Sequence, residues 1–229
     1  MLFIVNKNIL AEAKTNLRHY GDVIEFSTEN ITYPQISNHP DIFFCRIDGI
    51  LHYSPNTPDE VIQLLISKGI RVLKGDQPVG QKYPHSALYN AVITENYFIH
   101  NRKITDANLV QYIGNRKTIN VKQGYCRCSL LPLKNNCFIT SDEGIYKKLL
   151  SENLDVLYVS PHGIILPGEE YGLWGGTSGI TNDRIFILGN LDHFPMGGEV
   201  RNFLAIRNYE IIELYNGPLY DGGSILIIE

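Results

Sequence analysis

Cysteine is scarce in this sequence, and none of the spacings that mark a metal or redox site occurs. The 229 residues contain four cysteines and no C-x-x-C pair. The Cys126-x-Cys128 pair has no partner pair at zinc-site spacing. We therefore expect free thiols in a reducing compartment, no metal and no cofactor. The four cysteines are Cys45, Cys126, Cys128 and Cys137.

Long apolar runs and clusters of one charge are also missing. The apolar opening at residues 1–5 is too short for a signal peptide, and no stretch approaches the length of a membrane span. Net charge is −4, and no run of Lys or Arg exceeds two residues, which argues against a nucleic-acid partner. These features predict a cytoplasmic protein without membrane or nucleic-acid partners.

No motif of a common nucleotide-binding or hydrolytic enzyme is present. The sequence has no phosphate-binding P-loop, no dinucleotide-binding fingerprint, no nucleophile-elbow serine and no His-Glu-x-x-His motif. Its 44% apolar and 19% charged residues are typical of a globular protein. Function must therefore be sought in the organisation of the chain.

One pattern recurs five times along the sequence. It is a short apolar strand that ends in Asn or Ser, and its last residues, at positions 6, 54, 101, 141 and 190, are 48, 47, 40 and 49 residues apart. A helix pattern and another strand follow each copy, and a unit of this size buries its apolar faces only against neighbours of its own kind. The five strands are 3–6, 51–54, 98–101, 138–141 and 187–190.

An additional hairpin strand precedes four of the five copies. These strands are expected at 42–47, 89–94, 126–131 and 176–181. The first copy lacks one, and the apolar residues 224–228 have no helix after them, so we expect them to pair with residues 1–5. The pattern thus predicts one α/β domain, residues 1–229, of five ββαβ units closed into a ring without free sheet edges. An ordinary α/β sheet with alternating strands and helices is the alternative.

Five such units around an axis resemble the pentein fold, the five-bladed α/β-propeller of guanidino-group-modifying enzymes such as arginine deiminase and dimethylarginine dimethylaminohydrolase. A non-catalytic ribosome-binding translation factor is similar in fold. Several segments together resemble an uncharacterised clostridial family with this fold. They are 122–125 (KQGY) with Cys128, 139–142 (ITSD), 166–168 (LPG), 171–172 (YG), 175–179 (GGTSG) and 219–223 (LYDGG).

The resemblance implies a fold without the usual catalytic residues. In these enzymes a C-terminal Cys attacks the guanidinium carbon, a His moves protons and carboxylates hold the cationic substrate. Here Leu226 stands where the nucleophile is expected, and Arg46 and Ile47 stand where the carboxylates are expected. Residues 175–177 lack the acid of the Gly-Gly-Asp segment, and 123–125 lack the His.

A glycine-rich segment and two charged residues are the candidate ligand-binding positions. Glycines let a backbone approach a ligand closely, and an aromatic ring can stack on it. Arg46 in place of an acid favours an anionic ligand over a guanidinium cation. Alternatively, the glycines only turn the chain and the Trp fills the rim of the channel. The candidates are Arg46, Trp174, Gly175, Gly176, Thr177 and Asp221.

Three residues are candidates for catalysis. Cys126 and Cys128 are two positions apart on the expected strand 126–131, so both should point to one face. His39 could act as an unconventional base. Buried inert thiols, and a simple turn at His39-Pro40-Asp41, are the alternatives.

Three functions are compatible with these observations. The first is binding of a small polar ligand in an axial pocket without guanidine hydrolysis. The second is a protein-interaction module like the ribosome-binding relative. The third is a divergent hydrolase or transferase that acts on C–N bonds through a Cys. The sequence does not fix the oligomeric state.

Overall fold

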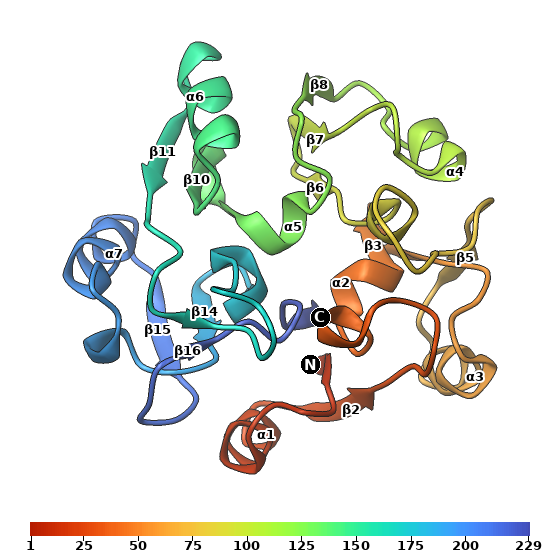
Figure 1. The fold of residues 1–229 in the computed structure, drawn as a ribbon, viewed down its shortest axis with the longest axis horizontal. Helices are drawn as coiled ribbons and strands as arrows, with labels where there is room; N and C mark the ends of the chain where they lie inside the picture. Colours follow the sequence, from red (N-terminus) through yellow and green to blue (C-terminus); the bar gives the residue numbers. More distant parts are fainter.

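The strands of the protein form five three-stranded sheets and one two-stranded sheet. The structure is a computed structural model that describes residues 1–229. In each three-stranded sheet the middle strand pairs antiparallel with one neighbour and parallel with the other. The sheets lie around a common centre, and the longer helices lie at the periphery (Figure 1).

The sheets have the following strands, in spatial order. They are β17 (Leu226–Ile228), β1 (Leu2–Asn6) and β2 (Asp22–Phe26); β3 (Phe44–Ile47), β4 (Ile50–Tyr53) and β5 (Val72–Lys74); β6 (Val92–Ile93), β7 (Tyr97–His100) and β8 (Lys117–Asn120); β9 (Leu130–Leu133), β10 (Cys137–Thr140) and β11 (Asp155–Tyr158); and β13 (Ser178–Ile180), β14 (Arg184–Ile187) and β15 (Glu210–Glu213). A small parallel pair, β12 (Ile164–Ile165) and β16 (Leu219–Tyr220), forms the sixth sheet.

A helix connects the two parallel strands of each three-stranded sheet. These helices are α1 (Ala11–Arg18), α3 (Asp59–Ser67), α4 (Ala107–Gln111), α6 (Glu143–Ser151) and α7 (Gly197–Ala205). Short helices are α2 (Pro40–Phe43) and α5 (Cys126–Ser129), and 3-10 turns are η1 (Pro34–Ile36), η2 (His85–Ala87), η3 (Lys134–Asn136), η4 (Trp174–Thr177) and η5 (Leu191–His193). None of the helices has the length and apolar character needed to span a membrane.

Helix α6 illustrates how the sequence fixes these connections. The Asp142 carboxylate accepts the Ile145 N–H at 2.7 Å and so caps the helix start. Ile145 and Leu149 lie four residues apart on one face and are fully buried. Asn153 then adopts a positive φ of 58°, which ends the helix and directs the chain into β11.

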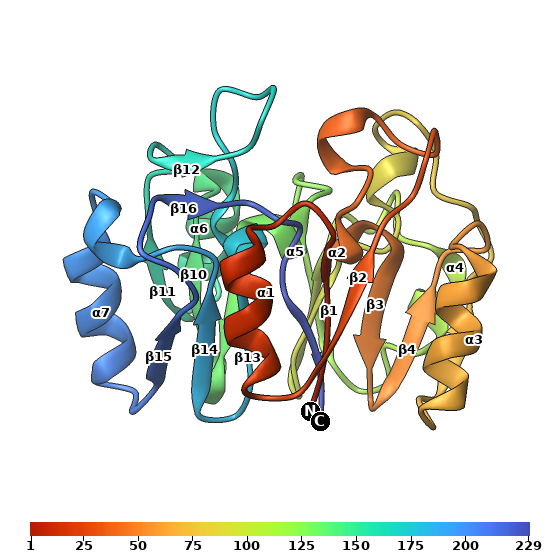
Figure 2. The same ribbon diagram turned by 90° about the horizontal axis from the view of Figure 1, so that it is seen from below.

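The two ends of the chain pair with each other. Strand β17 is antiparallel to β1, with Leu2 opposite Ile228 and Ile4 opposite Leu226. The N- and C-termini therefore lie side by side (Figure 2). The predicted pairing of the terminal strands is confirmed, although β17 is shorter than the expected strand 224–228. The six sheets remain separate, and no sheet closes on itself.

All four expected first hairpin strands start too early. The strand expected at 89–94 is only β6, Val92–Ile93, and in the other three a helical turn occupies the first residues. Residues 126–131 divide into α5 and β9, residues 42–47 begin inside α2, and residues 176–181 begin inside η4. In α5 the Ser129 N–H and hydroxyl both donate to Tyr125 O, at 3.1 and 2.8 Å. Cys126 and Cys128 are therefore on a helical turn, and their expected shared strand face does not exist.

Phe3 joins the terminal sheet to its neighbour, and its truncation should be costly. Its fully buried ring packs edge-on against Phe186 of β14, with 5.2 Å between centroids. We expect Phe3→Ala to lower the free energy of unfolding by about 3–5 kcal/mol. Ile206→Ala, at a side chain that is 78% exposed, should change it by less than about 0.5 kcal/mol. Urea denaturation measures both values, and a similar loss for the two variants would contradict this role of Phe3.

Candidate functional site

The segments that lead into the inner strands are hydrogen-bonded to one another at the centre of the molecule. The Asp41 N–H, before β3, donates to Gly223 O, before β17, at 3.3 Å. The Asn90 side-chain amide, before β6, donates to Asp41 O at 2.9 Å. The Arg127 N–H, before β9, donates to Asn90 O at 3.0 Å. These three hydrogen bonds link the β17 segment to the sheet of β3, that sheet to the sheet of β6, and that one to the sheet of β9.

The remaining links run through the segment before β13. The Arg127 guanidinium donates to Gly175 O at 2.8 Å and to Ser178 O at 2.9 Å. The Ser224 N–H donates to Gly176 O at 2.9 Å, which returns the path to the β17 segment. We call this closed path the central circuit. It satisfies backbone groups that are buried away from water and fixes where the neighbouring side chains point.

Three side chains with different donor atoms gather beside the central circuit. One ligand atom each from His39, Asp41 and Cys128 lies within 4.8 Å of the other two, and all three residues are buried. The Cys128 thiol donates to Asp41 Oδ2 at 3.1 Å. The Ser224 hydroxyl also donates to Asp41 Oδ2, and the Asn90 amide donates to Cys128 Sγ at 3.2 Å. We call His39, Asp41 and Cys128 the central triad.

The central triad contains polar atoms without partners. Both ring nitrogens of His39 and Oδ1 of Asp41 are buried and make no hydrogen bond. Buried polar groups are satisfied in the great majority of folded proteins, so three such atoms in one place require a reason. They are the unpartnered polar atoms of the triad.

Burial controls the charge of the triad. It lowers the pKa of His39 to about 4, so the imidazole is neutral at pH 7. Burial also raises the pKa of Asp41 and holds the pKa of the Cys128 thiol well above its ordinary value. In this state the site contains a neutral imidazole beside a protonated thiol, and Cys128 is not an activated thiolate.

Asp221 supports this centre from the other side. Its carboxylate accepts the Leu173 N–H at 2.8 Å and the Gly223 N–H at 3.0 Å, and it lies 3.9 Å from Nδ1 of His39. Burial raises its pKa to about 6. A Cβ at Gly176 would lie 1.9 Å from Asp221 Oδ1, so glycine there makes room for the carboxylate.

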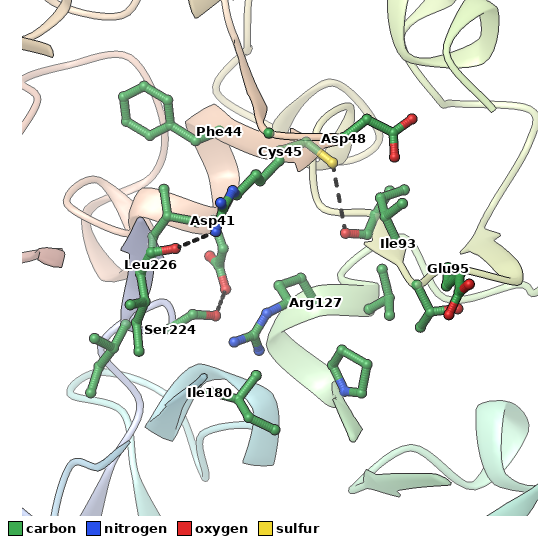
Figure 3. Close-up of a pocket in the computed structure, with 18 of the residues that line it drawn as sticks. Asp41, Phe44, Cys45, Asp48, Ile93, Glu95, Arg127, Ile180, Ser224 and Leu226 are labelled. Carbon is green, nitrogen blue, oxygen red and sulfur yellow. Dashed lines mark hydrogen bonds between the residues drawn. The ribbon is translucent and has the colours of Figure 1, made fainter. Parts of the chain in front are cut away.

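A cavity of about 460 Å³ opens next to the central triad. All five inner strands β3, β6, β9, β13 and β17 contribute to its walls. Asp41, Ser224 and Arg127 form its inner end, and the exposed Asp48 and Glu95 lie at its mouth. The Asp41 carboxyl and the Arg127 guanidinium point into this space (Figure 3). We call this space the axial cavity.

Arginines give the axial cavity much of its charge. The Arg46 guanidinium lines the wall and donates one hydrogen bond, from Nη1 to Ile227 O at 3.1 Å. A guanidinium has five N–H donors, so most of those of Arg46 remain available to a ligand. Arg116 pairs with Asp48 at the mouth.

Of the six predicted ligand-binding residues, Arg46 alone lines the axial cavity. Trp174 is fully buried and packs against Phe194 with 5.8 Å between ring centroids. Gly175 lies against Arg127 O, where a Cβ would be 2.1 Å away. Thr177 donates to Trp174 O at 2.7 Å. The glycine-rich segment thus packs behind the site. The lack of a side chain at Gly175 leaves room for the Arg127 carbonyl, and its lack at Gly176 leaves room for the Asp221 carboxylate.

The predicted catalytic candidates separate into two groups. Cys128 and His39 come together in the central triad, although they are far apart in sequence. Cys126 lies elsewhere, and its thiol donates to Gln123 O at 3.1 Å within an apolar cluster.

Sequence reasoning missed most polar residues of the centre. Asp41 lies in the His39-Pro40-Asp41 segment, where a simple turn was the alternative to a catalytic His39, and Asp41 itself was not a candidate. Asn90, Arg127 and Ser224 carry no motif, and only the convergence of separate segments reveals them.

Solved structures with a similar fold include an amidinotransferase, a dimethylarginine dimethylaminohydrolase and an agmatine deiminase. The amidinotransferase SxtG of saxitoxin biosynthesis from Microseira wollei has a TM-score of 0.59 and 10% identity, and the match covers 100% of this chain and 94% of that chain. Dimethylarginine dimethylaminohydrolase from Pseudomonas aeruginosa, complexed with citrulline, has a TM-score of 0.55 and 10% identity over 97% and 92%. Agmatine deiminase from C. jejuni has a TM-score of 0.53 and 13% identity over 95% and 78%.

At these identities the likeness establishes the fold alone. The chain has a mixed α/β fold similar to that of the pentein amidinotransferases and dimethylarginine dimethylaminohydrolase, as the sequence predicted. No curated protein sequence matches it. The model of a family of unknown function, DUF6873, matches residues 4–226. The chain therefore belongs to the DUF6873 family.

Proposed function

We propose that the protein binds a small polar ligand with an anionic group in the axial cavity, within a single-domain five-bladed α/β-propeller. The shared strand order of five sheets, the pairing of β1 with β17 and the central circuit support this architecture. The observation that carries the function is the Arg46 guanidinium, which lines the cavity with most of its donors free. An anionic group accepts such donors in charge-assisted hydrogen bonds.

The inner end of the cavity adds a second point of recognition. Asp41 Oδ1 has no partner. Burial raises the pKa of this carboxyl, and the nearby Arg127 guanidinium offsets part of that rise. A ligand donor that meets Asp41 while its anionic end meets Arg46 would satisfy both ends of the cavity. Such a ligand is polar at two positions, as expected of a small metabolite.

The same cavity is unsuited to the usual hydrolysis of a guanidinium substrate. Leu226 and Arg46 lie in its wall at the positions where the resemblance places the nucleophile and a substrate-binding acid. A leucine offers no nucleophile, and the Arg46 charge repels a cationic substrate. We therefore propose that this protein has the fold of these enzymes without their usual reaction.

The outer surface gives less support to an interaction module. The exposed large apolar side chains are distributed over several elements, and only α3 has two, Leu64 and Ile66. They include Leu10 before α1, Leu64 in α3, Leu150 in α6, Ile165 in β12 and Ile206 after α7. A partner surface usually presents a contiguous apolar patch. We place the function in the cavity for this reason.

Thermal unfolding in the presence of small anions tests the proposal. We expect phosphate or a dicarboxylate to stabilise the protein, by about 2.7 kcal/mol when the anion is at 100 times its Kd. Arg46→Ala should weaken this binding at least tenfold, because it removes the free guanidinium donors, as measured by calorimetry.

Arg184→Ala is the matched control, since Arg184 pairs with Glu210 on the surface and does not line the cavity. It should leave the anion effect unchanged. The proposal fails if no anion stabilises the wild type, or if the Arg46 and Arg184 variants respond alike.

A divergent enzyme that uses Cys128 is the second candidate, because the fold brings this thiol within 4.8 Å of a His39 nitrogen and of the Asp41 carboxylate. Such an enzyme would need the thiolate, and a neutral His39 could accept the thiol proton when substrate binds. The resting state, with its raised thiol pKa, is not activated.

Alkylation by iodoacetamide at pH 7, in a chelating buffer, distinguishes the two states of Cys128. We expect modification at least tenfold slower than that of an exposed thiol, because burial raises the pKa and limits access. Peptide mass spectrometry identifies the modified residue. Fast modification of Cys128 that His39→Gln abolishes would instead favour the enzyme.

A further inference from the structure

We propose that the central triad is a binding site for a transition-metal ion, with Zn²⁺ as the best fit. The imidazole of His39, the carboxylate of Asp41 and the thiol of Cys128 offer one nitrogen, one oxygen and one sulfur donor. Zinc sites in proteins are built from these three ligand types. The donors come from two distant segments of the chain that the central circuit holds together.

The unsatisfied atoms of the triad are those that a metal ion requires. His39 has two buried ring nitrogens without partners, and Asp41 has a buried Oδ1 without one. The three ligand atoms already lie within 4.8 Å of one another. With zinc at about 2.0–2.3 Å from each donor, small side-chain rotations would bring them to tetrahedral distances.

The residues around the triad supply the outer contacts of such a site. Asp221 Oδ1 lies 3.9 Å from His39 Nδ1, so it can orient the imidazole while Nε2 faces the metal. The Asn90 amide donates to Cys128 Sγ, which favours a sulfur that carries negative charge. Ser224 donates to Asp41 Oδ2 and holds that carboxylate. Each of the three ligands therefore has its own supporting residue.

The balance of buried charges at the centre also favours a bound divalent cation. Asp41 and Asp221 are both buried at the centre, and Arg127 is the one cationic side chain whose charge acts on both of them. A bound divalent cation would offset the second carboxylate and the Cys128 thiolate. On binding, the metal replaces the thiol proton, which passes to solvent.

Three protein ligands leave a fourth position on the metal. Asp41 belongs both to the triad and to the inner end of the axial cavity, so this position can face the cavity. An open fourth position is typical of zinc sites that bind water or another small ligand. The metal site itself needs no cavity ligand.

Cobalt loading of the full-length protein tests the site. We expect metal-free, reduced protein to bind one Co²⁺ per chain, with a thiolate-to-cobalt charge-transfer band in the near ultraviolet, and Zn²⁺ to displace it. Cys128→Ser should remove the band. His39→Gln and Asp41→Asn should weaken Co²⁺ binding at least tenfold.

Cys126→Ser is the matched control, because Cys126 is a buried thiol on the same helical turn and lies outside the triad. It should retain the band and the affinity, as should Cys45→Ser and Cys137→Ser. If Cys128→Ser does not fold by circular dichroism, persistence of the band in these three variants assigns it to Cys128 by elimination.

Two results would overturn the metal site. One is the absence of stoichiometric Co²⁺ binding or of the charge-transfer band in the wild type. The other is a band that Cys126→Ser, Cys45→Ser or Cys137→Ser removes. Arg46→Ala should keep the band, since Arg46 is not a ligand, so loss of anion binding and loss of the metal site remain distinguishable.

Discussion

The fold depends on the need to satisfy buried backbone groups where five sheets meet. Each inner strand begins at the centre of the molecule, and the residues before it have no sheet partner for some of their N–H and C=O groups. The central circuit meets this requirement by passing hydrogen bonds from one segment to the next, for example from Asp41 N–H to Gly223 O and from Arg127 N–H to Asn90 O. The sheets are otherwise separate, so these bonds and the apolar contacts between sheets hold them around one centre.

The same requirement concentrates chemistry at the centre. Residues that close the circuit through their backbone carry side chains such as Asp41 and Ser224 that must then be buried beside it. Burial disfavours the charged forms of Asp41 and of the neighbouring His39, which accounts for the raised pKa of Asp41 and the lowered pKa of His39. Burying polar atoms without partners costs stability, and both ring nitrogens of His39 and Oδ1 of Asp41 are such atoms.

Much of the fold could be predicted from the sequence because its signals are local. Short apolar runs that end in Asn or Ser indicated the middle strands, although the fifth, expected at 187–190, lies at Arg184–Ile187. An apolar C-terminal strand without a helix after it led to the predicted pairing with β1. The helical turns before the inner strands could not be predicted, because bonds such as Arg127 N–H to Asn90 O come from distant segments. The candidate site was harder to predict than the fold, because its residues also come from segments that are distant in the sequence. The sequence singled out Arg46, which lines the axial cavity, and His39 and Cys128, which lie in the central triad. The aromatic and glycine signals at Trp174 and Gly175 reflect packing.

The central claim is that the axial cavity holds an anion, and crystallography with an anomalously scattering anion tests it most directly. Crystals soaked in selenate, measured at the selenium edge, should show an anomalous peak inside the cavity within hydrogen-bonding distance of the Arg46 guanidinium. Anomalous peaks confined to the outer surface, with none in the cavity at saturating selenate, would contradict the account.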